Sequence, residues 1–421
     1  MQVTEWDEPQ AVIGSYLHRY AYPDWYAEHQ QRDQALQTAY AHGAGDAVQC
    51  LQLRGEYLFA AQGKAGMQVY DVASIANKGF SQRIITAPFS ELGHDAQLES
   101  PDASCVALPT NQPINPLRNE GELMRSVNQE QPFHPIYNYA VISDRQQGLL
   151  LANVNTFADG EPRNNQLEVA RRFNPDGLLD GASHVSLAGH YAYVTTPRSL
   201  VVVDLDQPLQ PRITQLLEMP DARSSQLQFR YLFVTTADGL QVLDATDLAR
   251  PKPLAASTLP LPDAQRIYLA RTYAYVADRD LGLVIVDIQQ PTAPSLYQAF
   301  NPEQQLSDAR DVVVGSTNAS LYAYVAAGRN GLRVVQLTAP DTQPGFYGFS
   351  PPPKPRLIAH YRSDQPALAL SKGLDRDRAV DETGGQIAVF GRIGSRPFTQ
   401  AEMRKLFVDS QGRPWTVSDQ P

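Results

Sequence analysis

One short motif, an apolar run closed by an acidic or amide residue, recurs along this chain of 421 residues. Its copies lie at residues 67–71, 149–153, 200–204, 240–244, 283–287 and 332–336, with a further copy at 1–5. A repeat of roughly 40 to 50 residues built from short β-strands is typical of a β-propeller, in which each unit packs only against its neighbours. The sequence therefore predicts an all-β repeat fold.

Each motif belongs to a longer unit, which is clearest at residues 264–300. A strand at 264–269 is followed by a Tyr-Ala-Tyr-Val strand at 273–276, in which β-branched and aromatic residues favour extended backbone. Gly282 supplies the backbone freedom for the next turn, the motif forms a third strand, and residues 295–300 form a fourth. We expect four strands in each blade.

Opening strands of this kind occur at 48–51, 103–106, 182–185, 224–227, 264–267 and 309–312, with a weaker one at 367–370. The last would be completed by 386–390 and by strands from the N-terminus, at 1–5 and 11–16. A blade shared by the two chain ends removes open sheet edges. We predict a seven-bladed β-propeller over residues 1–391, with six blades as the alternative, and a tail at 392–421 packed on it.

The copy Leu283-Val284-Ile285-Val286-Asp287 carries the signature of the LVIVD-repeat proteins, and the chain resembles that β-propeller family over most of its length. The resemblance implies a bacterial or archaeal extracytoplasmic protein, at the cell surface, secreted or periplasmic. Genes of such proteins often lie near those of multihaem c-type cytochromes. This sequence has no Cys-x-x-Cys-His, so it lacks the motif for covalent haem attachment.

The net charge of the chain limits the kinds of partner that it can bind. The formal net charge is -10, whereas a nucleic-acid partner requires a basic surface, so we expect no nucleic acid. No run of eighteen apolar residues occurs, and no transmembrane helix is predicted. Because position 1 falls inside a predicted strand, we expect Met1 to mark a processed or trimmed start.

Alignment of the opening strands places one residue of each near the central axis. In order, these are Cys50, Cys105, His184, Gln226, Arg266, Asp311 and Ala369. Cys50 and Cys105 are thus predicted neighbours. Arg266 and Asp311 are predicted to form an ion pair that lines the channel.

Three interpretations of the cysteines remain open. A disulfide requires Cα atoms about 4.4 to 6.8 Å apart. Two thiolates with the imidazole of His184 would suit zinc or copper(I). Two buried free thiols beside a hydrogen-bonded histidine would simply fill the channel. The predicted metal ligands are therefore Cys50, Cys105 and His184, and the predicted lining residues are Gln226, Arg266 and Asp311.

Four segments are too long for turns, and loops often carry function in a fold whose strands are committed to packing. These insertions lie at 18–45, 109–135, 155–166 and 338–355. The second contains His134, which has no motif around it, and the tail contains a predicted helix at 399–406.

Taken together, these features predict a non-enzymatic extracytoplasmic scaffold. It would bind a protein partner, such as a c-type cytochrome, through its insertions, without a cofactor of its own. The alternative is a metal- or small-molecule-binding enzyme with its site at the mouth of the channel.

Overall fold

The computed structural model describes residues 47–55, 57–71, 85–86, 97–111, 121–128, 132–159, 165–317, 320–340, 343, 350–372, 392–393, 396–397 and 399–413. The chain divides into two compact units. The first unit comprises residues 1–130 and 137–180, and the second comprises 131–136 and 181–421. The predicted insertion 18–45 lies outside the described residues.

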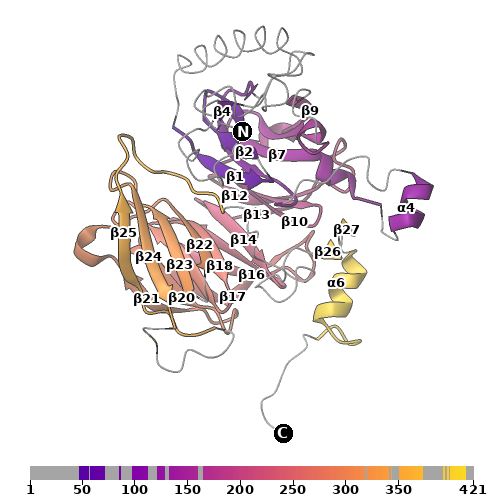
Figure 1. Cartoon of the computed structure of the whole chain (residues 1–421). Coiled ribbons are helices and arrows are strands. Elements are labelled where there is room, and N and C mark those ends of the chain that lie inside the picture. Colours follow the sequence, from indigo (N-terminus) through magenta and orange to yellow (C-terminus); the bar gives the residue numbers. More distant parts are fainter. Residues whose placement is uncertain are drawn as a thin grey trace, which may run out of the picture. The chain divides into compact units, whose positions relative to one another are not determined.

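The first unit contains two antiparallel sheets (Figure 1). Blade 1 consists of β1 (Cys50–Arg54), β2 (Tyr57–Ala61) and β3 (Met67–Asp71), with β4 (Ile85–Thr86) and β5 (Gln97–Leu98) both paired to β3. Blade 2 consists of β6 (Ala103–Ala107), β7 (Tyr139–Asp144), β8 (Gly148–Asn153) and β9 (Glu168–Phe173). The short helices are α4 (Glu122–Asn128), η3 (Pro135–Asn138), η4 (Asn155–Phe157) and η6 (Pro175–Gly177).

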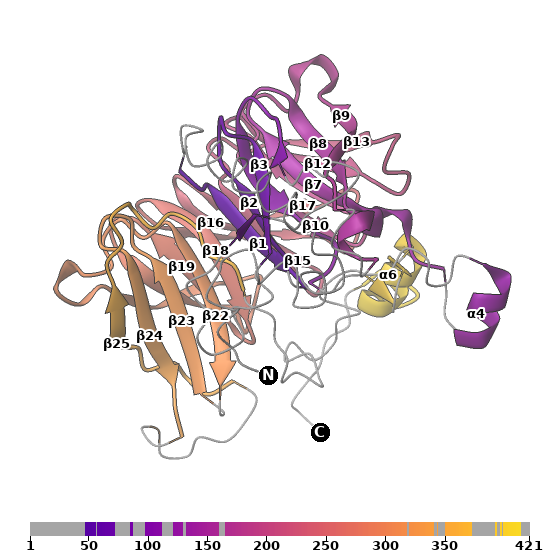
Figure 2. The ribbon, with the colours of Figure 1, turned by 45° about the horizontal axis from the view of Figure 1, so that its top comes forward.

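The second unit contains four sheets of four strands (Figure 2). Blade 3 is β10 (His184–Ala188), β11 (Tyr191–Thr195), β12 (Ser199–Asp204) and β13 (Arg212–Glu218). Blade 4 is β14 (Ser224–Gln228), β15 (Tyr231–Thr236), β16 (Gly239–Asp244) and β17 (Lys252–Pro260). Blade 5 is β18 (Ala264–Ala270), β19 (Tyr273–Asp278), β20 (Gly282–Asp287) and β21 (Ser295–Phe300). Blade 6 is β22 (Asp311–Thr317), β23 (Ser320–Ala326), β24 (Leu332–Thr338) and β25 (Arg356–Tyr361), preceded by η7 (Pro302–Gln304).

The recurring motif forms the third strand of each blade, as predicted. In blade 5 the pairs Tyr275↔Ile285 and Ile285↔Gln298 place it between the second strand and the outer one. All six residues of β12 are buried, whereas five of the six in β21 are exposed. Burial on both faces explains why the motif is apolar throughout and not alternating.

The fold is that of a β-propeller, and the described residues form six blades, the alternative number. Of the strands predicted for a seventh blade, residues 1–5, 11–16 and 386–390 lie outside the described residues. The described segment 367–370 makes a single antiparallel bridge, from Ala367 to Gly328, and no ladder. Its Ala-Leu-Ala-Leu sequence has no β-branched residue to favour a strand.

Within the second unit, the opening strands β10, β14, β18 and β22 lie side by side in that order. The apolar core fills the spaces between consecutive blades, with one cluster between blades 3 and 4, one between 4 and 5, and one between 5 and 6. Tyr193 in blade 3 also donates its hydroxyl to the carbonyl of Leu248 in blade 4, at 2.9 Å. Each blade is therefore stabilised by the next.

The C-terminal tail forms a short hairpin, β26 (Arg392–Ile393) with β27 (Arg396–Pro397), and the helix α6 (Gln400–Phe407). Thr399 caps α6 through a reciprocal pair of hydrogen bonds with Glu402. Met403 is 1% exposed and belongs to the cluster between blades 3 and 4. The helix thus packs on the second unit. None of the described helices is both long and apolar enough to cross a bilayer.

Candidate functional site

A buried aspartate organises the turn between the second and third strands of blades 2 and 5. In blade 5, the carboxylate of Asp278 accepts the backbone N–H groups of Asp263 at 3.1 Å and of Asp280 and Leu281 at 2.9 Å. The turn closes at Gly282, whose φ of +79° favours glycine. Asp144 makes the equivalent bonds in blade 2, where the sequence is again Asp-Arg-x-x-Gly. In blade 5, this carboxylate holds the loop that carries Arg279, one of the charged residues described next.

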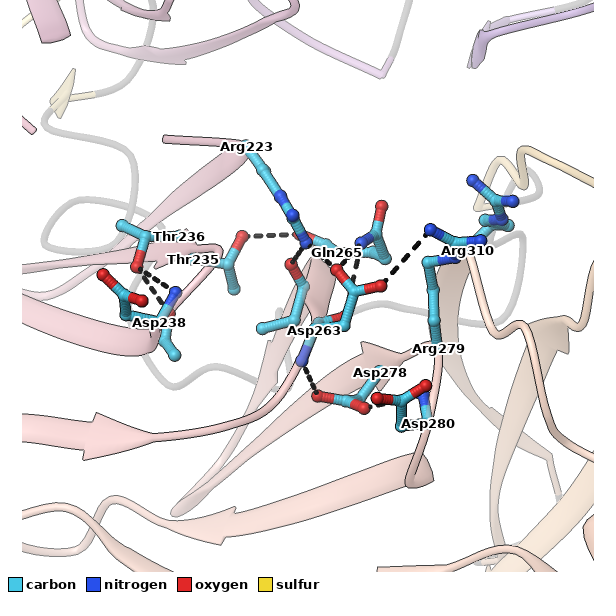
Figure 3. Close-up of polar contacts among 12 residues, drawn as sticks. Arg223, Thr235, Thr236, Asp238, Asp263, Gln265, Asp278, Arg279, Asp280 and Arg310 are labelled. Carbon is cyan, nitrogen blue, oxygen red and sulfur yellow. Dashed lines mark hydrogen bonds and ion pairs between the residues drawn. The ribbon is translucent and has the colours of Figure 1, made fainter. Parts of the chain in front are cut away.

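Three arginines and two aspartates form a continuous chain of ion pairs along blades 4, 5 and 6. Figure 3 shows the part of this chain around Asp263. Asp263, directly before β18, accepts from Nη1 of Arg223 and lies 3.3 Å from Nη1 of Arg279. Asp308, before β22, lies 3.0 Å from Nε of Arg279 and 2.7 Å from Nε of Arg310. We call these five residues the Arg–Asp chain.

The Arg–Asp chain joins loops of consecutive blades. Its side chains are between 19% and 43% exposed, so each pair contributes little free energy by itself. Each carboxylate is shared by two guanidinium groups. The Arg–Asp chain therefore links the loops of blades 4, 5 and 6 to one another.

The carboxylates that end the motif have a structural role. The Oδ1 atoms of Asp204, Asp244 and Asp287 each accept the backbone N–H two residues further on, at 2.8 to 2.9 Å. This hydrogen bond fixes the turn that follows the third strand.

The residues predicted to lie near the axis connect neighbouring opening strands. Gln226 Oε1 accepts the backbone N–H of Leu269 at 2.9 Å, which links blade 4 to blade 5. Asp311 accepts the N–H groups of Leu370 and Val312, each at 2.8 Å. Aligning the opening strands of the repeats thus identified residues that hold adjacent segments together. The role of Gln226 and Asp311 in lining a channel stays a prediction.

Asp311 has the most strongly perturbed carboxyl group of the described residues. Burial raises its pKa from 3.8 to about 6, although the charge of Arg266 and the two backbone N–H groups act in the opposite direction. The effect of burial on the pKa of Asp311 is therefore larger than the opposing effect of Arg266, with which the sequence predicted an ion pair.

We expect Asp311→Asn to remove part of the pH dependence of stability. Because the folded-state pKa of about 6 exceeds the ordinary 3.8, the folded protein binds more protons between these values, and its stability falls as the pH rises across that window. The amide mimics the neutral carboxyl, so at pH 7 the variant should be more stable by about 2 kcal/mol. Urea unfolding from pH 4 to 7 measures this change, with the exposed Asp364→Asn as control. Equal slopes for the wild type and Asp311→Asn would contradict it.

The two cysteines are neighbours, as predicted, and form a disulfide. Cys50 in β1 and Cys105 in β6 have Cα atoms 4.8 Å apart. The bond joins the opening strands of blades 1 and 2, and these residues are 8% and 1% exposed. The structure thus favours the first of the three interpretations of the cysteines.

The metal site predicted at Cys50, Cys105 and His184 requires thiolates, and disulfide sulfurs are not thiolates. His184 begins β10 in the second unit, where it is buried, and its Nδ1 has no hydrogen-bond partner among the described residues. A metal shared by these three residues stays a prediction that applies to the reduced protein.

The insertion at 109–135 is anchored at both ends on the turn that follows β1. The N–H of Gly55 donates to the carbonyl of Asn111 at 2.9 Å, and Nη1 of the buried Arg54 donates to the carbonyl of Tyr137 at 3.4 Å. Burial lowers the pKa of Arg54 to about 10, so its guanidinium stays charged at neutral pH. Between these anchors lies α4, whose apolar side chains are exposed.

A second polar cluster lies where three loops of the second unit meet. Nε2 of His134 lies 3.2 Å from Oδ1 of Asp206, and its ring is stacked on that of His190, with centroids 5.5 Å apart. Nε2 of His190 lies 3.6 Å from Oδ1 of Asp204. Burial lowers the pKa of both histidines, while the two aspartates act to raise it. We call His134, His190 and Asp206 the His–Asp cluster.

Sequence reasoning missed both polar arrangements. The available signals were the repeated Asp-Arg-x-x-Gly turn, at 144–148 and 278–282, and the Asp-x-Asp spacing of Asp204 and Asp206. His134 was noted as a loop histidine, but nothing in the sequence pairs it with His190, 56 positions away by residue number.

Comparison with known proteins agrees with the geometry of the blades. The family model of the LVIVD repeat matches residues 181–213, 263–301 and 308–344. The chain is a β-propeller that contains LVIVD repeats. The matched stretches of the LVIVD-repeat chain contain β10 to β12, β18 to β21, and β22 to β24. No curated protein matches its sequence.

A solved structure shows a similar fold at low sequence identity. A crystal structure of a protein from Lactobacillus plantarum has a TM-score of 0.52 and 12% identity, covering 76% of the LVIVD-repeat chain and 86% of that protein. The β-propeller domain of Cps50 (Swd1) from Myceliophteria thermophila has a TM-score of 0.47 and 9% identity, with 77% and 89% covered. The likeness is one of fold alone.

Proposed function

We propose that this protein is a non-enzymatic extracytoplasmic scaffold that binds a protein partner through the insertion at 109–135. The observation that carries this proposal is the apolar surface of α4. Leu123, Met124 and Val127 are 75%, 45% and 69% exposed. Three large apolar side chains on one short helix are costly to leave in water, and such patches often mark interaction sites.

The anchoring of the insertion supports the same function. Gly55 donates to the carbonyl of Asn111, near the start of the insertion, and Arg54 donates to the carbonyl of Tyr137, just after its end. Glu122 in the first turn and Arg125 in the last turn complement the helix dipole. A helix with an exposed apolar surface fits a complementary groove on another protein.

The disulfide supports an extracytoplasmic location. A bond between Cys50 and Cys105 persists in an oxidising compartment and is uncommon in a reducing cytoplasm. In this setting, the partner class suggested by LVIVD-repeat relatives is a redox protein such as a multihaem c-type cytochrome.

Replacing Leu123 and Val127 by serine tests the proposal. The tagged wild type should capture a haem protein from an extract of the native host, detected by the haem absorbance of the eluate. The double variant should capture at least about tenfold less, because central apolar contacts dominate binding energy at interfaces. Its circular dichroism should match that of the wild type, because both side chains are exposed.

The matched control is the double variant Leu296→Ser and Ile358→Ser. These side chains are 50% and 44% exposed on β21 and β25, so equal numbers of apolar side chains are removed elsewhere. Capture should be unchanged. Equal haem absorbance for the α4 variant and the wild type, or none for either, would argue against the proposed partner.

The second candidate is an enzyme at the mouth of the channel. Asp311, with its pKa of about 6 beside the charge of Arg266, is the observation that favours it, because perturbed carboxyl groups are frequent at catalytic sites. Asp311 also holds two backbone N–H groups, which accounts for its position without a substrate. The scaffold therefore remains the function that the geometry supports best.

A further inference from the structure

We infer that His134, His190 and Asp206 form a binding site for a divalent transition-metal ion of the zinc class. One donor atom from each residue lies within 4.8 Å of the other two. Two imidazoles and one carboxylate form a ligand set that suits zinc and its neighbours, whereas calcium and magnesium prefer oxygen alone. This cluster is separate from Cys50, Cys105 and His184.

The spacing of the donors agrees with a small coordination sphere. Zinc binds nitrogen and oxygen at about 2.0 to 2.2 Å, which in a tetrahedron separates two ligands by about 3.3 to 3.5 Å. Nε2 of His134 and Oδ1 of Asp206 are already 3.2 Å apart. The donor of His190 lies within 4.8 Å of both atoms, so an approach of up to about 1.5 Å would complete a three-ligand site with one position left for water.

The loops that carry the donors are fixed to one another. The N–H of Leu205 donates to the carbonyl of His190 at 2.8 Å, which ties the loop after β12 to the turn before β11. Asp204 accepts the N–H of Asp206 at 2.9 Å and pairs with Arg212 at 2.7 Å. Binding would therefore need little ordering of Asp206 or His190.

His190 has a second feature that a ligand would account for. Its Nδ1 is buried and has no hydrogen-bond partner among the described residues, while Nε2 lies 3.6 Å from the carboxylate of Asp204. A carboxylate beside one ring nitrogen fixes the orientation of a metal-bound imidazole, as is common around zinc. Tyr191 packs its ring on His190 at 4.2 Å and shields it further.

His134 couples the site to its loop. The N–H of Ile136 donates to Nδ1 of His134 at 3.1 Å, which leaves the proton of the neutral ring on Nε2, facing Asp206. A metal ion at Nε2 takes the place of that proton, so Nδ1 must gain one and Ile136 must give up its hydrogen bond. Metal binding would therefore shift the end of the insertion, at residues 133–136.

Zinc titration of the full-length protein, without reductant so that the disulfide stays intact, tests the inference. We expect one equivalent of Zn²⁺ per chain in competition with a chromophoric chelator. Co²⁺ should give the visible absorption of a site with nitrogen and oxygen ligands. His134→Ala and His190→Ala should each weaken binding by at least about tenfold.

Two further variants keep the result decisive. Asp206→Asn preserves the shape of the side chain but removes the charge of one ligand, so it should also lower the affinity for zinc. This variant serves as the test if a histidine variant fails to fold. His360→Ala removes an exposed histidine of β25 in the same unit and should bind like the wild type. The inference is overturned if the wild type takes up less than one equivalent, if the cluster variants bind normally, or if His184→Ala alone abolishes binding.

Discussion

Replacing Ile285 by alanine should lower the free energy of unfolding by about 3 kcal/mol. Ile285 is the central residue of the motif in β20 and has no exposed surface. It belongs to the cluster between blades 5 and 6, together with Tyr275, Val312 and Val335. Truncation removes buried methyl groups and leaves a cavity that two sheets, each fixed by its ladder, cannot fully close. Urea unfolding followed by circular dichroism measures the loss.

Ile358→Ala is the matched control. Ile358 is 44% exposed on the outer strand β25, so the same chemical change should cost less than about 1 kcal/mol. A comparable loss in the two variants would mean that burial of the third strand is not what stabilises the repeat.

Loss of the Cys50–Cys105 bond should also lower the free energy of unfolding, by about 3 kcal/mol. The disulfide closes a loop of 55 residues between the first strands of blades 1 and 2, and its removal increases the entropy of the unfolded chain. The double variant Cys50→Ala and Cys105→Ala should unfold at lower urea and lower temperature than the wild type. Reductant should lower the unfolding midpoint of the wild type toward that of the variant. It should leave the midpoint of the variant unchanged.

A thiol count provides an independent check on the same bond. Denatured wild-type protein, prepared without reductant, should contain no titratable thiol, because both cysteines are in the disulfide. Two reactive thiols in protein isolated from its native compartment would contradict the bond and the proposed extracytoplasmic location together.

Most of the blade architecture was predictable because it depends on local patterns. Strand propensity and apolar content fixed β12, β20 and their equivalents, and recurrence at a regular interval indicated a propeller. The aspartates that end the motif are equally local, because Asp204, Asp244 and Asp287 each bind a backbone N–H two residues further on.

The number of blades was predicted less well. The segment 367–370 resembles an opening strand in sequence, and Ala367 does reach Gly328, but a strand also needs a continuous partner. Pairing over many residues depends on where two distant segments come together, which short apolar runs do not specify.

The sequence by itself determined the class of fold, the third strand of each blade, and which residues begin adjacent blades, because side-chain burial repeats with the strand. Only the tertiary structure decided that Cys50 bonds to Cys105, that Arg223 reaches Asp263, and that His134 meets His190 and Asp206. The reason is physical. Which loops approach one another depends on how whole sheets pack. A contact between two loops produces no repeating pattern in the sequence of either loop.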